Sequence, residues 1–241
     1  MTPVLALHGF TGSPQSWDFL AERPLAPSLI GHVGCAAQPE IQSFEAEVDR
    51  LAGLIPGSDP VHVVGYSLGG RLALGLALRH APRVRRVTLL SAHPGLASEG
   101  ERAARRAADE AWCELLLGRG LSVFVDAWQA QPLWASQERL GQASRDAKRN
   151  ERLSQSAVGL VQSLRSTGLG QMPSYRERLQ GLTLPVAIVA GELDEKFTAL
   201  ARHMAERIPR SEIHIVPGAG HDLLLERPEF ITEVIRRGNQ P

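Results

Sequence analysis

The feature that most constrains the fold of this chain lies between residues 61 and 74. A short β-branched run, Val61–Val64, leads into Gly65-x-Ser67-x-Gly69, and an Ala/Leu-rich run with helical spacing follows. A strand, a sharp turn and a helix in this order present a serine at the turn as a nucleophile. An ordinary strand-to-helix turn is the alternative interpretation. We predict that Ser67 is a nucleophile whose hydroxyl projects from the end of a strand.

The rest of the chain alternates between apolar runs typical of buried strands and segments with helical periodicity. Strands are predicted at 4–7, 84–90, 184–190 and 212–216, with a weak one near 29–30, and helices at 16–20, 43–55, 68–80, 197–208 and from about 228. Residues 97–182 offer several helical pieces and no good strand candidate. We therefore predict an α/β fold in which a mostly parallel, doubly wound sheet is formed by residues 1–96 and 183–241. Residues 97–182 are predicted to form a helical cap inserted in the same domain.

Composition excludes several classes of function. The 26 basic residues balance the 26 acidic ones, so the net charge favours neither nucleic acid nor a membrane surface. Cys35 and Cys113 have no metal-ligand spacing. The first strand begins too early for a signal peptide, and no run approaches the roughly 18 apolar residues of a membrane span. We expect a cytoplasmic monomer or weak homo-oligomer without metal or cofactor.

A serine hydroxyl needs a base to become reactive, and the base needs an orienting carboxylate. His221 lies in a glycine-rich loop directly after a late strand, and Asp194 follows the strand before that one. The carboxyl ends of parallel strands meet at one edge of a sheet, where Ser67 also lies. We predict His221 as the base and Asp194 as its partner, with Asp222 and Glu192 as rival acids.

A second loop is expected beside Ser67. The first strand ends at His8-Gly9-Phe10, and the glycine lets the backbone of this loop approach the serine. The backbone N–H groups of Phe10 and Leu68 are predicted to form an oxyanion hole, which stabilises negative charge developing on a substrate oxygen. The imidazole of His8 is expected to be structural.

Several motifs indicate a known family. They are Leu7–Gly12 (LHGFTG), Gly65–Arg71 (GYSLGGR), His93–Leu96 (HPGL), Gly191–Phe197 (GELDEKF) and Gly218–His221 (GAGH), with the cap pieces Glu101–Arg105, Trp128 and Ser163–Arg165. With these motifs and the order Ser, Asp, His, the chain resembles the α/β-hydrolase superfamily. More narrowly, it resembles the 2-succinyl-6-hydroxy-2,4-cyclohexadiene-1-carboxylate synthases of menaquinone biosynthesis. Arg71 directly after the serine turn, HPGL and GELDEKF are the most particular of these features.

The resemblance implies a carbon–oxygen lyase that eliminates pyruvate from an enolpyruvyl cyclohexene substrate, with Ser67, Asp194 and His221 as a catalytic triad. Such a substrate is a small anion with several carboxylates, and guanidinium groups bind carboxylates in pairs of hydrogen bonds. The substrate-binding residues implied are Tyr66, Arg71, Arg105, Trp128, Arg152 and Lys196, with Arg149 as a competitor of Arg152.

The chain departs from the superfamily pattern in the loop at residues 28–35, which reads SLIGHVGC in place of D-x-P-G-H-G-x-S. The leading hairpin strands are also expected to be absent or minimal. Two other readings remain open. One is a serine carboxylesterase, thioesterase or C–C bond hydrolase, for which an apolar pocket is expected in place of an arginine cluster. The other is a non-catalytic small-molecule receptor, since fold alone does not determine function.

Overall fold

The centre of the computed structural model, which describes residues 2–35 and 38–239, is a five-stranded sheet. Its strands are β1 (Val4–Leu7), β2 (Val61–Tyr66), β3 (Val84–Leu90), β4 (Val186–Gly191) and β5 (Ser211–Val216). Every neighbouring pair is parallel, and the spatial order follows the chain. Apart from the weak strand near residues 29–30, each predicted strand forms within two residues of its expected bounds.

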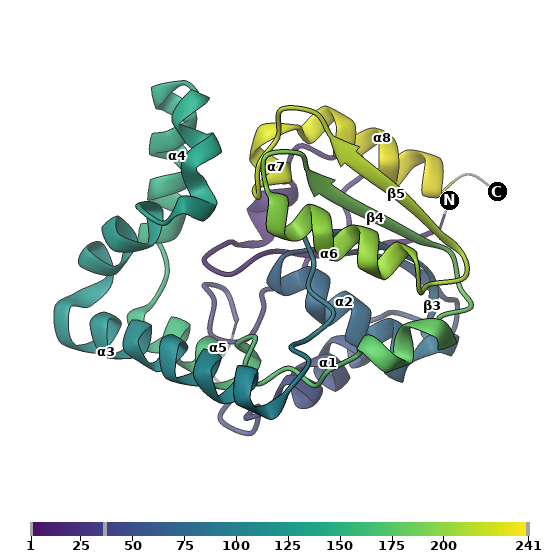
Figure 1. Ribbon diagram of the computed structural model, residues 1–241, viewed down its shortest axis with the longest axis horizontal. Helices are drawn as coiled ribbons and strands as arrows, with labels where there is room; N and C mark the ends of the chain where they lie inside the picture. The colour runs from purple at the N-terminus through teal and green to yellow at the C-terminus, as the bar shows by residue number, and fades with distance from the viewer. Residues whose placement is uncertain (1, 36–37, 240–241) are drawn as a thin grey trace.

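Helices cover both faces of this sheet (Figure 1). Apolar side chains of α1 (Phe44–Gly53), α2 (Leu68–Arg79) and α6 (Glu195–Ala205) pack on one face. On the other face lie α7 (Leu223–Glu226) and α8 (Pro228–Gly238). Neighbouring strand residues such as Val63 and Val64 point to opposite faces and are both fully buried. This two-sided burial explains why β1, β2 and β4 read as continuous apolar runs, whereas the edge strand β5 is partly exposed and includes polar residues.

The segment between β1 and α1 differs from the prediction. The helix expected at 16–20 is a single 3-10 turn, η1 (Pro14–Trp17). The weak strand expected near 29–30 is wrong, because Leu29 and Ile30 are buried in a loop and only Leu25 makes a parallel bridge, to Leu5. The prolines at positions 24 and 27 flank this bridge and have no N–H to donate to a ladder, which prevents a longer strand.

The chain between β3 and β4 is described throughout and contains helices but no strand. These are α3 (Glu99–Gln129), η3 (Pro132–Arg139), α4 (Gln142–Leu153), α5 (Ala157–Thr167) and η4 (Arg176–Gly181). Figure 1 shows α3 and α4 standing off the side to which β4 and β5 point. The long α3 bends at Gly120, whose φ of 81° interrupts helical geometry. None of the helices in the described chain, including the long α3, is both long and apolar enough to cross a bilayer.

The helical insertion has an apolar cluster of its own, in which Phe124, Trp128 and Leu160 are buried. Phe10, from the loop after β1, packs against this cluster and against the core of the sheet. Residues 169–182, assigned to the cap by the sequence, instead contribute side chains such as Met172 and Tyr175 to the core cluster. The division into core and cap stays a prediction, and this packing favours a cap that ends near residue 168.

Two buried histidines make stability depend on pH. Burial lowers the pKa of His32 and of His62 to about 4, although hydrogen bonds to each ring oppose the shift. In the unfolded chain each histidine is expected to have a pKa of about 6.5. Between these values the unfolded state binds more protons, so the free energy of unfolding falls as pH falls, by about 1.4 kcal/mol per pH unit for each histidine. The stabilisation is complete above about pH 6.5.

We therefore expect His62→Gln to lose less stability than the wild type between pH 7.5 and pH 5. Urea unfolding at several pH values measures this slope. The two proteins are first compared at pH 8, where both histidines are neutral and the variant shows only the cost of its altered contacts with Thr88 and Asn239. Parallel pH profiles for the two proteins would contradict the prediction.

Candidate active site

Ser67 occupies a strained turn between β2 and α2. Its backbone angles, a φ of 51° and a ψ of −104°, lie in a region that residues other than glycine rarely adopt. A Cβ on Gly65 would clash with the backbone of Gly69, and one on Gly69 would clash with the carbonyl of Leu7. Both flanking positions of the Gly65-x-Ser67-x-Gly69 motif therefore need glycine for steric reasons.

Three side chains from separate strand ends are hydrogen-bonded in series at this turn. Ser67 Oγ lies 3.0 Å from His221 Nε2, and His221 Nδ1 lies 2.7 Å from Asp194 Oδ2. His221 is 1 % exposed and Asp194 8 %. The other oxygen of Asp194 accepts a hydrogen bond from the Phe197 N–H, which fixes the carboxylate at the start of α6. Such a series can take a proton from a serine hydroxyl and stabilise the resulting imidazolium.

The loop that carries His221 is held closely against neighbouring strand ends. A Cβ on Gly191 would clash with the Gly220 carbonyl, so glycine at the end of β4 lets this loop approach. At the end of β3, Ser91 has a φ of 46° and its hydroxyl donates to the carbonyl of His221. The Phe197 ring packs on the imidazole with their centroids 4.5 Å apart. The imidazole is thus restrained through both its backbone and its ring.

The two rival acids have other partners. Glu192 accepts a hydrogen bond from the Gly218 N–H, and Asp222 forms an ion pair with Lys148. Of the three acids, Asp194 is the one hydrogen-bonded to the His221 ring.

The predicted oxyanion groups lie beside the serine. The Gly69 N–H donates to the His8 carbonyl, so the loop after β1 is bound directly to the start of α2. Phe10 and Leu68 both line the cavity that contains Ser67. Among the described residues, neither of their N–H groups has a hydrogen-bond acceptor. Both are therefore free to bind an oxygen of a ligand. The His8 imidazole instead accepts from the Leu29 N–H, as expected of a structural histidine.

The serine opens into a cavity of about 830 Å³ between the strand ends and the helical insertion. Five of the six residues predicted to bind substrate line it: Tyr66, Arg71, Arg105, Trp128 and Lys196. It is also lined by residues to which the sequence analysis gave no role, among them His93, Trp112, Gln131, Trp134, Arg139 and Phe197. His93 and Phe197 belong to the HPGL and GELDEKF motifs, which could have indicated them. Arg139 belongs to none of the motifs that the sequence analysis identified.

The cavity is lined by four cationic side chains, Arg71, Arg105, Arg139 and Lys196, and by three carboxylates, Asp109, Asp194 and Glu195. Burial, and then the charge of nearby Arg105, lower the pKa of Arg71 to about 9, yet the group stays charged at neutral pH. Burial, then the charges of Arg71 and Lys196, also lower the pKa of His93 to about 3. Asp109 partly neutralises the charge of Arg105, because its carboxylate accepts a hydrogen bond from Arg105 Nε at 2.8 Å. Cations held in a partly desolvated cavity favour a ligand with negative charges.

Three residues that line the cavity carry buried polar atoms without a partner. Tyr66 Oη, Trp128 Nε1 and Trp134 Nε1 have no hydrogen-bond partner within the described chain, although buried polar groups are normally paired. In contrast, no group of three or more His, Cys, Asp or Glu in residues 2–35 and 38–239 is arranged to hold a metal.

Arg152 is the predicted substrate-binding residue that does not line the large cavity. It is 2 % exposed, and its guanidinium carbon lies 4.9 Å from the centre of the Trp134 ring, which does line the cavity. Its competitor Arg149 pairs with Asp126 in an exposed contact. Arg152 is thus the more buried of the two and lies one aromatic layer behind the site.

Comparison with known proteins gives first the broad class of this protein and then its narrower family. A model described as the alpha/beta hydrolase family matches residues 4–234, so the chain belongs to this family. The 2-succinyl-6-hydroxy-2,4-cyclohexadiene-1-carboxylate synthase of Salmonella newport is 35 % identical over 96 % of this chain and 92 % of its own length. A Bacillus subtilis protein that carries the same name provisionally is 37 % identical over 96 % of this chain and 88 % of its own. At this similarity the chain belongs, within the α/β hydrolases, to the family of these synthases.

Solved structures agree with this placement. MenH from S. aureus superimposes with a TM-score of 0.92 at 29 % identity, covering 98 % of this chain and 92 % of that one. A thermophilic esterase from Thermogutta terrifontis, bound to malate, superimposes with a TM-score of 0.82 at 25 % identity, over 99 % and 89 % of the two chains.

Proposed function

We propose that the protein is a carbon–oxygen lyase of menaquinone biosynthesis, which eliminates pyruvate from a multiply carboxylated enolpyruvyl cyclohexene substrate. One observation carries this proposal: the Ser67–His221–Asp194 series opens into a cavity where Arg71, Arg105 and Lys196 converge. An esterase for neutral substrates has no need of these cations, whereas a substrate with several carboxylates needs each of them. The names of the relatives support the same activity.

In the proposed mechanism, His221 takes the proton of Ser67, and the serine oxygen then removes a proton from a ring carbon of the substrate. Electrons of the broken C–H bond enter the ring as a double bond, and the C–O bond to the side chain breaks. The enolate that leaves becomes pyruvate when it receives the proton held by His221. Proton transfer by a positioned base contributes typically about 10²- to 10⁴-fold in rate.

Negative charge builds on a conjugated carboxylate or carbonyl of the substrate as the proton leaves. We assign its stabilisation to the Phe10 and Leu68 N–H groups, which have no other acceptor within the described residues and lie beside Ser67. The remaining carboxylates pair with Arg71, Arg105 and Lys196, while Tyr66 and Trp128 complete the pocket. No acyl-enzyme is required on this route.

The proposal is tested by incubating the purified protein with the enolpyruvyl substrate and measuring pyruvate release. Hydrolysis of p-nitrophenyl acetate is followed in parallel, and Ser67→Ala protein prepared in the same way controls for contaminating enzymes. We expect fast pyruvate release with feeble esterase activity. Fast ester hydrolysis without pyruvate release would favour the serine hydrolase instead, and ligand binding without either reaction would favour a receptor. The cytoplasmic location and the monomeric or weakly oligomeric state stay predictions.

A further inference from the structure

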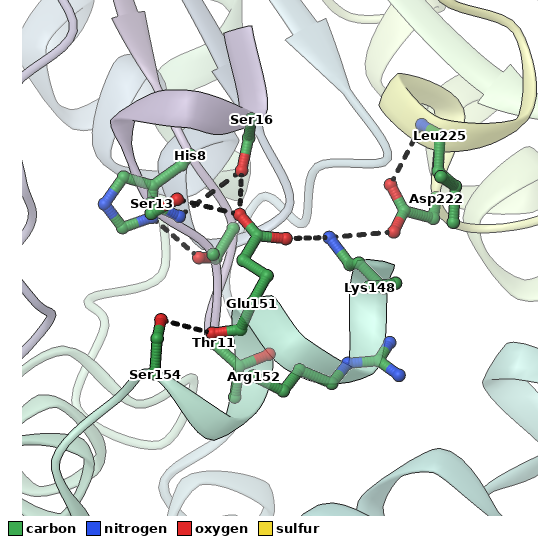
Figure 2. Close-up of polar contacts among 12 residues, drawn as sticks. His8, Thr11, Ser13, Ser16, Lys148, Glu151, Arg152, Ser154, Asp222 and Leu225 are labelled. Atoms are coloured by element: carbon green, nitrogen blue, oxygen red, sulfur yellow. Dashed lines mark hydrogen bonds and ion pairs between the residues drawn. The ribbon is translucent and has the colours of Figure 1, made fainter. Parts of the chain in front are cut away.

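A buried ion network joins the cap helix α4 to the loop that carries His221 (Figure 2). Lys148 Nζ lies 3.2 Å from Asp222 Oδ2 and 3.0 Å from Glu151 Oε2. The Asp222 side chain is fully buried, and that of Lys148 is 12 % exposed. Asp222 directly follows His221, so the cap contacts the residue next to the predicted base. We call Lys148, Glu151 and Asp222 the α4 latch.

The latch also reaches the loop after β1. Glu151 Oε1 accepts hydrogen bonds from Ser13 Oγ at 2.9 Å and from Ser16 Oγ at 2.7 Å. This loop carries Phe10, which we assign to the oxyanion hole. One turn of α4 therefore holds both loops whose positions define the proposed reaction site.

Other cap residues bind the two sides of His221 in the same way. On one side, Gln137 Nε2 donates to Asp222 at 3.4 Å. On the other side, the Gly220 N–H donates to Glu226, whose second oxygen accepts from Ser136 Oγ at 2.9 Å. Gln137 and Ser136 belong to η3 of the cap. The loop around the base is thus fastened to the cap on both sides by carboxylates.

The charges of the latch depend on one another. Burial alone would lower the pKa of Lys148, but the carboxylates of Asp222 and Glu151 outweigh it and raise this pKa. Without Lys148, the fully buried Asp222 side chain would keep only Gln137 and the Leu225 N–H as hydrogen-bond partners in the described chain, and Arg152 as a nearby cation. Removing one partner of a buried ion pair is costly, so the loop is expected to shift until water reaches Asp222.

We infer that Lys148 is a positioning residue: through Asp222 it aligns the His221 loop, so that the imidazole stays within hydrogen-bond distance of Ser67. This inference rests on the proposed function only through the roles of Ser67 and His221. It assigns Lys148 no contact with substrate, because Lys148 does not line the large cavity. A shift of about 1 Å in a catalytic group can cost up to roughly a hundredfold in rate.

The test compares Lys148→Met, Asp222→Asn and the double variant with wild type. The main measurement is the rate at which a sulfonyl fluoride modifies Ser67, followed by mass spectrometry, because it reports activation of Ser67 by His221 whatever the natural substrate is. Steady-state pyruvate release gives kcat and KM separately. Arg145→Met is the matched control, since it removes an exposed positive charge from the same helix.

We expect each of the three variants to lower the labelling rate and kcat about ten- to hundredfold, with KM little changed. The double variant should lose no more than either single one, because both changes break the same link. Arg145→Met should behave as wild type. If Lys148→Met does not fold, Asp222→Asn and the double variant, which leaves no stranded charge, carry the test. Wild-type labelling rates in the folded variants, losses that multiply, or a loss confined to KM would overturn the inference.

Discussion

Ser67→Ala and His221→Ala are each expected to lower kcat/KM for pyruvate release by at least about 10³-fold. The reason is the 3.0 Å contact between Ser67 Oγ and His221 Nε2, through which the base and the hydroxyl act as one unit. Combining the two changes should therefore add little to the loss from either one. Steady-state kinetics of the two single variants and the double variant measure this coupling.

Asp194→Asn extends the same prediction. The amide keeps the size of the carboxylate but no longer selects the tautomer in which His221 Nδ1 carries the hydrogen, so the rate should fall by orders of magnitude while the fold is retained. Ser166→Ala is a suitable control for Ser67→Ala. Ser166 is a buried serine whose hydroxyl donates a hydrogen bond within α5, and it does not line the cavity. Independent, multiplying losses for Ser67 and His221 would argue against a coupled pair.

The second large effect separates the lyase from an esterase. Arg71→Ala should lower kcat/KM for the anionic substrate about ten- to hundredfold, because a charge-assisted hydrogen bond contributes roughly 1.5–3 kcal/mol. Hydrolysis of p-nitrophenyl acetate should stay nearly unchanged, since a small neutral ester needs Ser67 and His221 but no guanidinium. Arg105→Ala should act in the same direction, although Arg105 is half-exposed and shares its charge with Asp109. Parallel assays of both substrates give the comparison.

Arg79→Ala is the matched control for this comparison. Arg79 lies at the far end of α2, the helix that carries Arg71, and it pairs with Asp49 at the surface. Its loss should leave both activities unchanged. Equal losses on both substrates in Arg71→Ala would contradict the assigned role. A trapped acyl-Ser67 during turnover of the natural substrate would contradict the proposed route without an acyl-enzyme.

A residue that positions His221 can be distinguished from one that binds substrate. The two assays needed are turnover of the anionic substrate and a reaction that requires only the Ser67–His221 pair, such as ester hydrolysis or sulfonyl fluoride labelling. A change at Arg71 is expected to affect only the anionic substrate, whereas a change at Lys148 should slow every reaction that needs the Ser67–His221 pair. The difference follows from their locations. Arg71 lines the cavity, and Lys148 lies outside it in contact with the neighbour of His221.

Much of the fold could be predicted from the sequence because its signals are local. Apolar runs bounded by turn residues became β1, β2 and β4, since a strand buried on both faces needs apolar residues at nearly every position. The predicted strands β3 and β5 also formed, although each includes partly exposed charged or polar residues. The Gly65-x-Ser67-x-Gly69 turn was also readable, because glycine at each flanking position is required by the close approach of the backbone. The order of strand ends then brought Asp194 and His221 to the same edge as Ser67.

Other features depend on contacts that no local pattern encodes. The sequence left Arg149 and Arg152 as competitors within the predicted cap. Only packing of α4 onto Trp134 buried Arg152 and left Arg149 paired at the surface. The pairing of Lys148 with Asp222 joins residues of α4 to a loop much later in the chain. Spacing along a helix determines which side chains share a face. The tertiary structure alone decides what that face meets, because burial of a charge depends on the partners that other segments supply.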